Sequence, residues 1–251
     1  MKLIVLALCS FASAASAADL AAVQKAGVLR VGTTGDYKPF SFHAPDGSYR
    51  GADITMARSL AEKLGVRVVF VPTTWSTLSA DFVAGRFDIA VGGVTILPAR
   101  ETIADFSTAT LVDGKRPITR CADRTRFNSI AAIDQPGVRV VVNPGASNET
   151  FARAHFPHAK LTVFPDNVSV FDEIAAGRED VMVTDGIEVD HQALMHPGLC
   201  AAAVPAPFTR LEKAYMLPRD PAFVAAVDAW WADQQRTGAW QRALDAAQHE
   251  P

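Results

Sequence analysis

Two carboxylates follow a short apolar run in the second half of the chain. The segment Val181-Met-Val-Thr-Asp-Gly-Ile-Glu188 begins with three apolar residues, which predict the end of a buried strand. In an open α/β sheet, ligands bind just outside the carboxyl ends of the strands, so Thr184 and Asp185 would reach such a site. If a helix begins after Gly186, Asp185 and Glu188 share one face of it. The alternative is that Asp185 caps this helix and Glu188 is a solvated surface charge.

Two other segments carry groups that are suited to binding anions. Arg100 follows a loop that begins at Gly92, and a guanidinium after a strand end can hold a carboxylate through two parallel hydrogen bonds. Gly145-Ala-Ser-Asn148 precedes a predicted helix, whose first N–H groups attract negative charge. Ser147 is also a candidate N-cap, and both interpretations can hold at once. For Arg100 alone, a surface arginine would be the default interpretation.

Three aromatic residues, Tyr37, Phe40 and Trp75, lie in loops that follow predicted strands. They are able to form a flat wall for a ring-shaped or apolar ligand. The alternative is that they only bury loop backbone.

The elements that would position these residues occur twice. Strands and helices alternate over residues 28–91 and again over 138–183. Ala84-Gly-Arg-Phe-Asp88 and Ala176-Gly-Arg-Glu-Asp180 each lie between a predicted helix and a predicted strand, and Pro72 and Pro165 end equivalent strands. We interpret the pattern as two copies of one β-α-β-α-β unit.

Two such units predict an α/β fold with two lobes and a ligand cleft between them. The chain would cross between the lobes over 109–120 and return over 206–216. Helices predicted at 222–236 and 239–248 would then dock on lobe one, where Trp230, Trp231 and Trp240 are interpreted as packing residues. The predicted boundaries are 1–17 for a leader, 18–115 with 212–251 for lobe one, and 116–211 for lobe two.

The first 17 residues have the pattern of a secretory signal peptide. Lys2 precedes a short apolar run from Leu3 to Ala12, and Ala15-Ser-Ala17 is a cleavage site of the A-x-A type. We expect export to the periplasm and release near Ala17, without a membrane anchor. In an oxidising compartment, Cys121 and Cys200 favour a disulfide over two free thiols or a metal pair.

Composition and motif searches exclude several function classes. The 251 residues are 49% hydrophobic and 20% charged with a net charge of -3, which is typical of a globular protein and argues against nucleic acid as a partner. The chain carries no G-x-S-x-G, Walker A or G-x-G-x-x-G motif. Its histidines are scattered, so we expect neither a metal site nor a cofactor. The oligomeric state stays open.

Longer motifs in both halves resemble the polar amino-acid class of the family 3 periplasmic solute-binding proteins, which have a two-lobed type II fold. The resemblance covers nearly all of the chain after the leader. The matching segments are Tyr37-x-Pro-Phe40, Gly51-x-Asp53, Ala84-Gly-x-x-Asp88 and Thr95-x-x-x-x-Arg100-Glu-x-x-x-Asp-Phe-Ser107.

The resemblance implies roles for individual residues. The arginine at the position of Arg100 holds a ligand α-carboxylate, and the residues matching Gly93 and Thr95 add hydrogen bonds. Those matching Tyr37 and Trp75 sandwich the ligand side chain, and the aspartate matching Asp185 takes its α-amino group.

A narrower set of segments resembles the periplasmic cyclohexadienyl dehydratases. These enzymes convert prephenate to phenylpyruvate and arogenate to phenylalanine on a solute-binding fold. The segments are Thr33-Thr-Gly-Asp-Tyr-Lys-Pro-Phe40, Ile118-Thr-Arg-Cys121, Asp134-Gln-Pro-Gly-Val138, Asn143-Pro-Gly, Pro165-Asp-Asn-Val168, Thr184-Asp-x-Ile-Glu188 and Glu212-Lys-Ala-Tyr-x-Leu-Pro-Arg-Asp220. In that family the catalytic acid is a glutamate at the position of Glu188, and Cys121 and Cys200 resemble its cysteine pair.

We therefore expect Glu188 to protonate the departing hydroxyl of a small-molecule substrate, prephenate or arogenate. Its pKa should be raised by enclosure and by Asp185. The residues expected to bind the substrate are Tyr37, Trp75, Gly93, Thr95, Arg100, Asn143, Ser147, Asn148 and Asp185. The alternative function is an amino-acid receptor of an importer, which would share Arg100 and Asp185.

Overall fold

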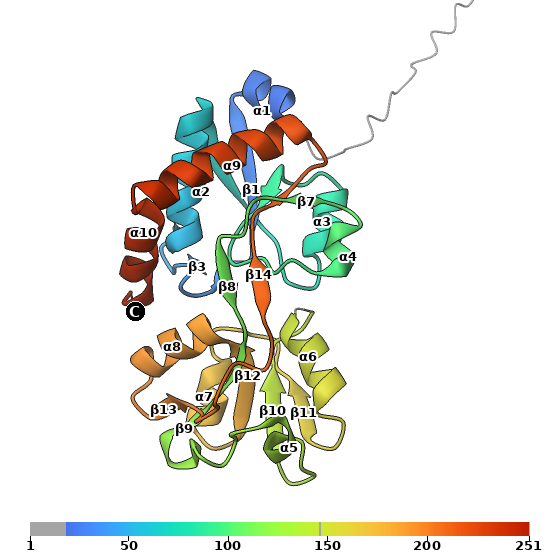
Figure 1. Ribbon diagram of the computed structural model, residues 1–251, viewed down its shortest axis with the longest axis vertical. Helices are drawn as coiled ribbons and strands as arrows, with labels where there is room; N and C mark the ends of the chain where they lie inside the picture. Colours follow the sequence, from blue (N-terminus) through green and yellow to red (C-terminus); the bar gives the residue numbers. More distant parts are fainter. Residues whose placement is uncertain (1–18, 146, 251) are drawn as a thin grey trace, which may run out of the picture.

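The computed structural model describes residues 19–145 and 147–250, which form two lobes stacked end to end (Figure 1). The leader predicted at 1–17 lies outside the described residues. Each lobe is built on a five-stranded sheet. The strands of the lobe-one sheet, in spatial order, are β5 (Arg67–Pro72), β1 (Val28–Thr33), β6 (Ile89–Ala90), β15 (Met216–Leu217) and β7 (Asp105–Phe106). Those of lobe two are β11 (Lys160–Val163), β10 (Arg139–Val142), β12 (Val181–Asp185), β9 (Lys115–Arg120) and β13 (Leu199–Ala201).

The two sheets have the same topology. In each, the first three strands are parallel and the fourth, β15 or β9, runs antiparallel to its neighbours. The predicted repeat is thus present in the fold. Its two matched aspartates also make matched contacts: Asp88 accepts the backbone N–H of Arg30 at 2.8 Å, and Asp180 accepts that of Arg139 at 3.0 Å.

Helices cover the faces of both sheets (Figure 1). Lobe one carries α1 (Leu20–Ala26), α2 (Ala52–Leu64), α3 (Leu78–Val83), α4 (Pro98–Glu101), α9 (Pro221–Arg236) and α10 (Ala239–Gln248), with a small sheet of β2 (Asp36–Tyr37), β3 (Ser41–His43) and β4 (Tyr49–Arg50). Lobe two carries η1 (Cys121–Asp123), α5 (Ile130–Ile133), α6 (Ser147–His155), α7 (Val170–Ala175) and α8 (Gly186–Met195). None of these helices is long and apolar enough to cross a membrane.

The lobes are joined by an antiparallel pair of strands, β8 (Leu111–Asp113) and β14 (Leu211–Lys213), which Figure 1 shows running between them. The predicted crossings at 109–120 and 206–216 contain these strands. The residue boundaries given above for the two lobes stay a prediction.

Both sheets are buried on their two faces, which explains their continuous apolar runs. In β10 and β12, Val140 and Val181 pack into one apolar cluster while their neighbours Val141 and Met182 pack into another. Successive side chains of a strand point to opposite faces, so one run fills two cores.

The C-terminal helices close the core of lobe one. Trp230 and Trp231 are 1% exposed and Trp240 is 7% exposed, and all three belong to one apolar cluster. The ring centroids of Trp231 and Trp240 are 5.2 Å apart with an edge-to-face geometry. The interpretation of these residues as packing is confirmed.

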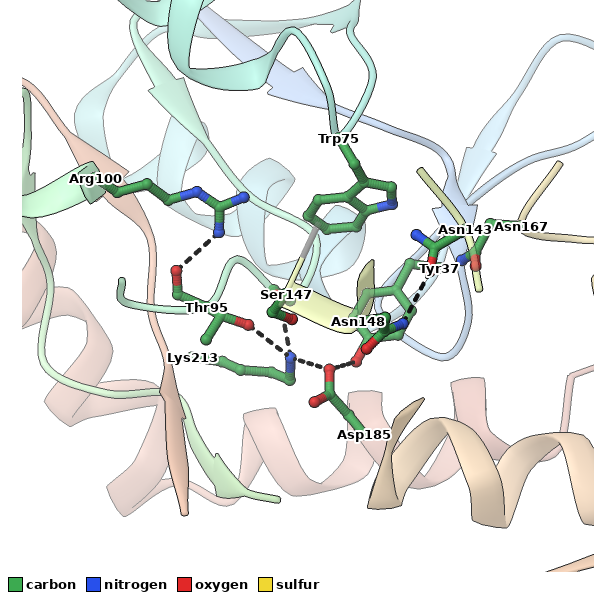
Figure 2. A pocket seen from close by; sticks show the side chains of 11 residues that line it. Tyr37, Trp75, Thr95, Arg100, Asn143, Ser147, Asn148, Asn167, Asp185 and Lys213 are labelled. Atoms are coloured by element: carbon green, nitrogen blue, oxygen red, sulfur yellow. Dashed lines mark hydrogen bonds and ion pairs between the residues drawn. The ribbon is translucent and has the colours of Figure 1, made fainter. Parts of the chain in front are cut away.

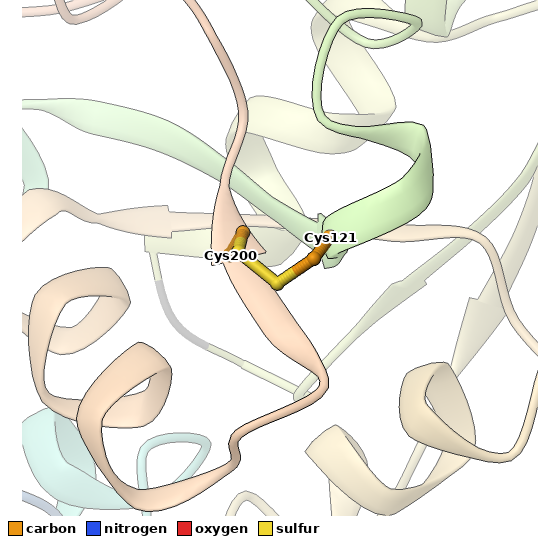
Figure 3. Close-up of a disulfide and its surroundings, with 2 residues drawn as sticks. All are labelled: Cys121 and Cys200. Carbon is orange, nitrogen blue, oxygen red and sulfur yellow. A yellow bond between two sulfur atoms is a disulfide. The ribbon is translucent and has the colours of Figure 1, made fainter.

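A disulfide joins Cys121 and Cys200, as predicted (Figure 3). Cys200 lies in β13, which pairs with β9, and Cys121 directly follows β9. The disulfide therefore links the edge strand β13 to the end of β9, although the two cysteines are 79 residues apart in the sequence.

Candidate functional site

A cavity lies between the lobes, and about 290 Å³ of it, including space open to solvent, is free of protein atoms. Figure 2 shows Arg100 on one side, Asn143 and Asn167 on the other, and Asp185 and Trp75 between them. The lining residues are Tyr37, Trp75, Gly93, Thr95, Arg100, Asn143, Ser147, Asn148, Asn167, Asp185 and Lys213.

Every residue that the sequence analysis predicted to bind the substrate lies on this lining. The prediction that they bind a substrate itself remains to be tested. Both lobes contribute, because each of these residues follows a strand end or begins a helix at the cleft. Two lining residues, Asn167 and Lys213, were not predicted.

Tyr37 and Trp75 form an aromatic corner on lobe one. Their ring centroids are 5.7 Å apart and their planes meet at 82°. The indole N–H of Trp75 donates to Asp36 at 3.0 Å, which orients the ring. Tyr37 also packs in the apolar core of lobe one.

Arg100, in α4, is a buried cation at the cavity. It is 5% exposed, and within the described part of the chain its guanidinium makes one hydrogen bond, to the carbonyl of Thr95 at 2.8 Å. No ion pair joins it to any carboxylate of residues 19–145 and 147–250. Burial lowers the pKa of Arg100 to about 10, so the guanidinium is still charged at neutral pH. A buried charge of this kind needs an anion, which a ligand carboxylate would supply.

Gly93 follows β6 and presents its carbonyl to the cavity. Its φ is 71°, and a Cβ there would lie 2.6 Å from the rings of Phe40 and Tyr37, so only glycine fits. The Gly93 N–H is already donated to Asp53, at 2.7 Å. The carbonyl accepts from Lys213, at 3.2 Å.

Asp185 is held by three donors in a buried network. Its Oδ1 accepts from Lys115 Nζ at 2.9 Å, and its Oδ2 accepts from Lys213 Nζ at 2.6 Å and from the Tyr37 hydroxyl at 2.5 Å. Burial would raise the pKa of Asp185, but the two ammonium groups lower it well below its usual value. Asp185 is the N-cap residue of α8, in line with the alternative interpretation, but its carboxylate makes no capping hydrogen bond and is paired with the two lysines instead.

Glu188 lies in the first turn of α8 and is 1% exposed, so the alternative of a solvated surface charge is wrong. Burial, together with the nearby charge of Asp185, raises the pKa of Glu188 to about 8. Most of the glutamate is therefore protonated at neutral pH, as the sequence analysis predicted.

Glu188 is not one of the residues that line the cavity. It lies behind them, in contact with the lining residue Asn167. Thr184 donates to one of its oxygens, and the Asn167 side-chain amide approaches the other at 3.5 Å. Asn148 in turn donates to Thr184, at 3.0 Å, and to Asn143, at 2.9 Å. Catalytic hydrogen bonds are often longer without a bound substrate, so this geometry is compatible with a catalytic role.

The sequence analysis missed the roles of Lys115, Lys213, Asn167 and Thr184. The last three lie inside segments that carried the resemblance, which was the available signal. Lys115 had no local signal. It meets Asp185 because β9 pairs with β12 in a register that places these two residues opposite each other.

Among the described residues, no group of three or more His, Cys, Asp or Glu side chains is arranged to hold a metal ion.

Comparison with known proteins places the chain in a family. The model of bacterial extracellular solute-binding proteins, family 3, matches residues 29–246. Cyclohexadienyl dehydratase of Pseudomonas aeruginosa is 48% identical over 223 residues, which are 89% of this chain and 83% of that protein.

Two solved structures of reconstructed ancestors also match. An ancestral amino acid-binding protein, described as a precursor of cyclohexadienyl dehydratase, has a TM-score of 0.83 at 33% identity and covers 90% of this chain and 97% of its own. An ancestral cyclohexadienyl dehydratase has a TM-score of 0.58 at 49% identity, with coverages of 92% and 96%.

Proposed function

We propose that this chain, which belongs to the family 3 bacterial extracellular solute-binding proteins, is a cyclohexadienyl dehydratase with Glu188 as its general acid. It converts prephenate to phenylpyruvate and arogenate to phenylalanine. The observation that carries the proposal is a buried glutamate, protonated at neutral pH, beside a cavity with an unpaired cation.

The reaction requires the delivery of one proton to the oxygen of the departing 4-hydroxyl group. The bond between the ring and its carboxylate breaks to release carbon dioxide, and its electron pair makes the ring aromatic. The bond to the 4-hydroxyl breaks at the same time, and Glu188 protonates the departing oxygen to give water. Glu188 then regains its proton from solvent. A positioned acid contributes about 10²–10⁴-fold to such a step.

The other lining residues bind and orient the substrate. Arg100 holds one carboxylate in a bidentate grip, and the N-terminus of α6 at Ser147 and Asn148 faces the other. Tyr37 and Trp75 pack against the ring and exclude water.

Asn167 positions the leaving hydroxyl next to Glu188. It is 4% exposed, its amide nitrogen donates to the carbonyl of Asp36 at 2.9 Å, and its Oδ1 has no hydrogen-bond partner among the described residues. A buried carbonyl without a donor is costly, and the substrate hydroxyl would supply that donor.

The place of action proposed is the periplasm, after cleavage near Ala17. The match to an extracellular family and the disulfide support it, since disulfides persist in oxidising compartments. In the same proposal, 18–115 with 212–251 form lobe one and 116–211 form lobe two.

The test is turnover of prephenate by the purified mature protein, followed as phenylpyruvate, beside Glu188→Gln. The parent should turn over and Glu188→Gln should lose about 10²–10⁴-fold in kcat while it still binds substrate. Glu62→Gln, on the exposed face of α2, is the matched control and should keep full activity.

Two outcomes would contradict the proposal. Full activity in Glu188→Gln would remove Glu188 as the acid. No turnover by the folded parent, with thermal stabilisation by an amino acid, would make the chain a receptor instead.

A further inference from the structure

We propose that Lys213, together with Lys115, makes the site select an α-keto acid over an α-amino acid, and therefore prephenate over arogenate. The two substrates differ only at the side chain, where prephenate carries a keto group and arogenate an ammonium group. This inference rests on the proposed function and assigns its substrate preference.

An α-ammonium group needs an anionic acceptor inside the cavity. Among the described residues, Asp185 is the one carboxylate that lines the cavity. Glu188, behind the lining, is largely neutral because of its burial. Asp185 would therefore have to receive the ammonium of arogenate.

Asp185 already carries its full complement of charged partners. Lys115 and Lys213 are 0% and 1% exposed, and each forms an ion pair with a different oxygen of this carboxylate, at 2.9 and 2.6 Å. The Tyr37 hydroxyl adds a third donor. A substrate ammonium would have to displace one of these groups or lie beside two buried cations, and like charges repel strongly in such a site.

Neither lysine is free to move aside. Besides Asp185, Lys213 Nζ donates to the carbonyl of Gly93 at 3.2 Å and to the hydroxyl of Thr95 at 3.3 Å. Lys115 Nζ donates to Ser147 at 2.9 Å and to Asn148. Three partners satisfy all three hydrogens of each ammonium group, so both are anchored within the protein.

The charge on the lining is also positive. Arg100 and Lys213 are opposed there by Asp185, and Lys115 lies behind the lining on the other oxygen of Asp185. Asp36, Asp53 and Asp113 are likewise off the lining and accept from other donors. The ammonium group of arogenate would meet this surplus of positive charge, whereas the keto group of prephenate would not.

The experiment measures kcat/KM for prephenate and arogenate in the parent, Lys213→Met and Lys63→Met. The parent should prefer prephenate by about tenfold or more. Lys213→Met removes the ammonium but keeps a similar stem, so it should lower this ratio by about tenfold. Lys63→Met, on the exposed face of α2, should leave the ratio unchanged.

Calorimetric binding of phenylpyruvate and L-phenylalanine to the parent gives a second test that requires neither turnover nor a folded variant. Phenylpyruvate should bind more tightly. If it does while the parent turns over neither substrate, the selectivity stands and the dehydratase function fails. Equal or tighter binding of phenylalanine, or an unchanged ratio in folded Lys213→Met, would overturn the inference.

Discussion

The two lobes repeat one scaffold and differ where the central strand ends. In lobe one, β6 is followed by Gly92 and Gly93, both with positive φ, and their N–H groups are donated to Asp53. In lobe two, β12 ends on Thr184 and Asp185, and α8 begins at once. The aspartates before the two central strands are nevertheless matched, since Asp88 and Asp180 each accept a backbone N–H and an arginine side chain.

This difference divides the chemistry between the lobes. In the proposed mechanism, lobe one supplies a guanidinium and aromatic rings that bind the substrate. Lobe two supplies Glu188 as the acid, together with the first residues of α6, which bind the second carboxylate. The shared unit places residues at the cleft, and the few residues after its strands determine what each lobe can do there.

The comparison predicts that the burial of the lobe-two acid lowers stability. The pKa of Glu188 is raised from 4.5 to about 8, so the folded state binds more protons between these values and its free energy of unfolding falls as pH rises through them. Glu188→Gln should escape this fall, so its free energy of unfolding should gain roughly 4 kcal/mol on that of the parent between pH 4 and pH 8. Denaturant unfolding from pH 4 to pH 9 measures it. Parallel curves for both proteins would show that Glu188 ionises normally.

The binding role of lobe one is tested at its cation. Arg100→Lys keeps the charge and loses the planar pair of donors, so KM for prephenate should rise about 30-fold with a smaller change in kcat. Steady-state kinetics measure the two separately. Arg219→Lys, an exposed arginine of the same lobe, serves as the control. A loss confined to kcat would place Arg100 with the reacting groups and break the division of labour.

The equivalence of the scaffolds is tested by paired substitutions. Asp88→Asn and Asp180→Asn each replace a buried carboxylate that accepts a backbone N–H and an arginine side chain. Each should lower the free energy of unfolding by about 2 kcal/mol, with exposed Asp172→Asn as the control. Chemical denaturation gives the two losses. A large loss of stability at one site alone would mean that the two aspartates share a geometry but contribute differently to the stability of their lobes.

The reactive role of lobe two predicts a pH limit. The acid must be protonated, and the pKa of Glu188 is about 8, so the rate should be nearly constant below about pH 7, fall by about half at pH 8 and fall about fivefold more from pH 8 to pH 9. A pH profile of kcat/KM for prephenate measures it. A profile that stays flat to pH 9.5 would contradict Glu188 as the acid.

Much of this site could be predicted from the sequence, because many of its residues directly follow predicted strands. The paired segments ending in Asp88 and Asp180 predicted the repeat, and the residues after the strands predicted the lining. Glu188 and Arg100 were candidates from their types and positions, but the resemblance supplied their roles, since a carboxylate three residues after a strand is as compatible with a surface position as with an active site. No spacing in the chain pointed to Lys115.

The sequence by itself determined two β-α-β-α-β units, the polar groups after their strands and the cysteine pair. Only the tertiary structure decided the state of those groups. Asp185 contacts Lys115, which is 70 residues away in the sequence, and Tyr37, which is 148 residues away. These contacts pair its negative charge with hydrogen-bond donors. Glu188 is neutral because packing removes it from water. Burial and charge proximity are properties of the assembled cleft, and residues so far apart along the chain carry no local sign of them.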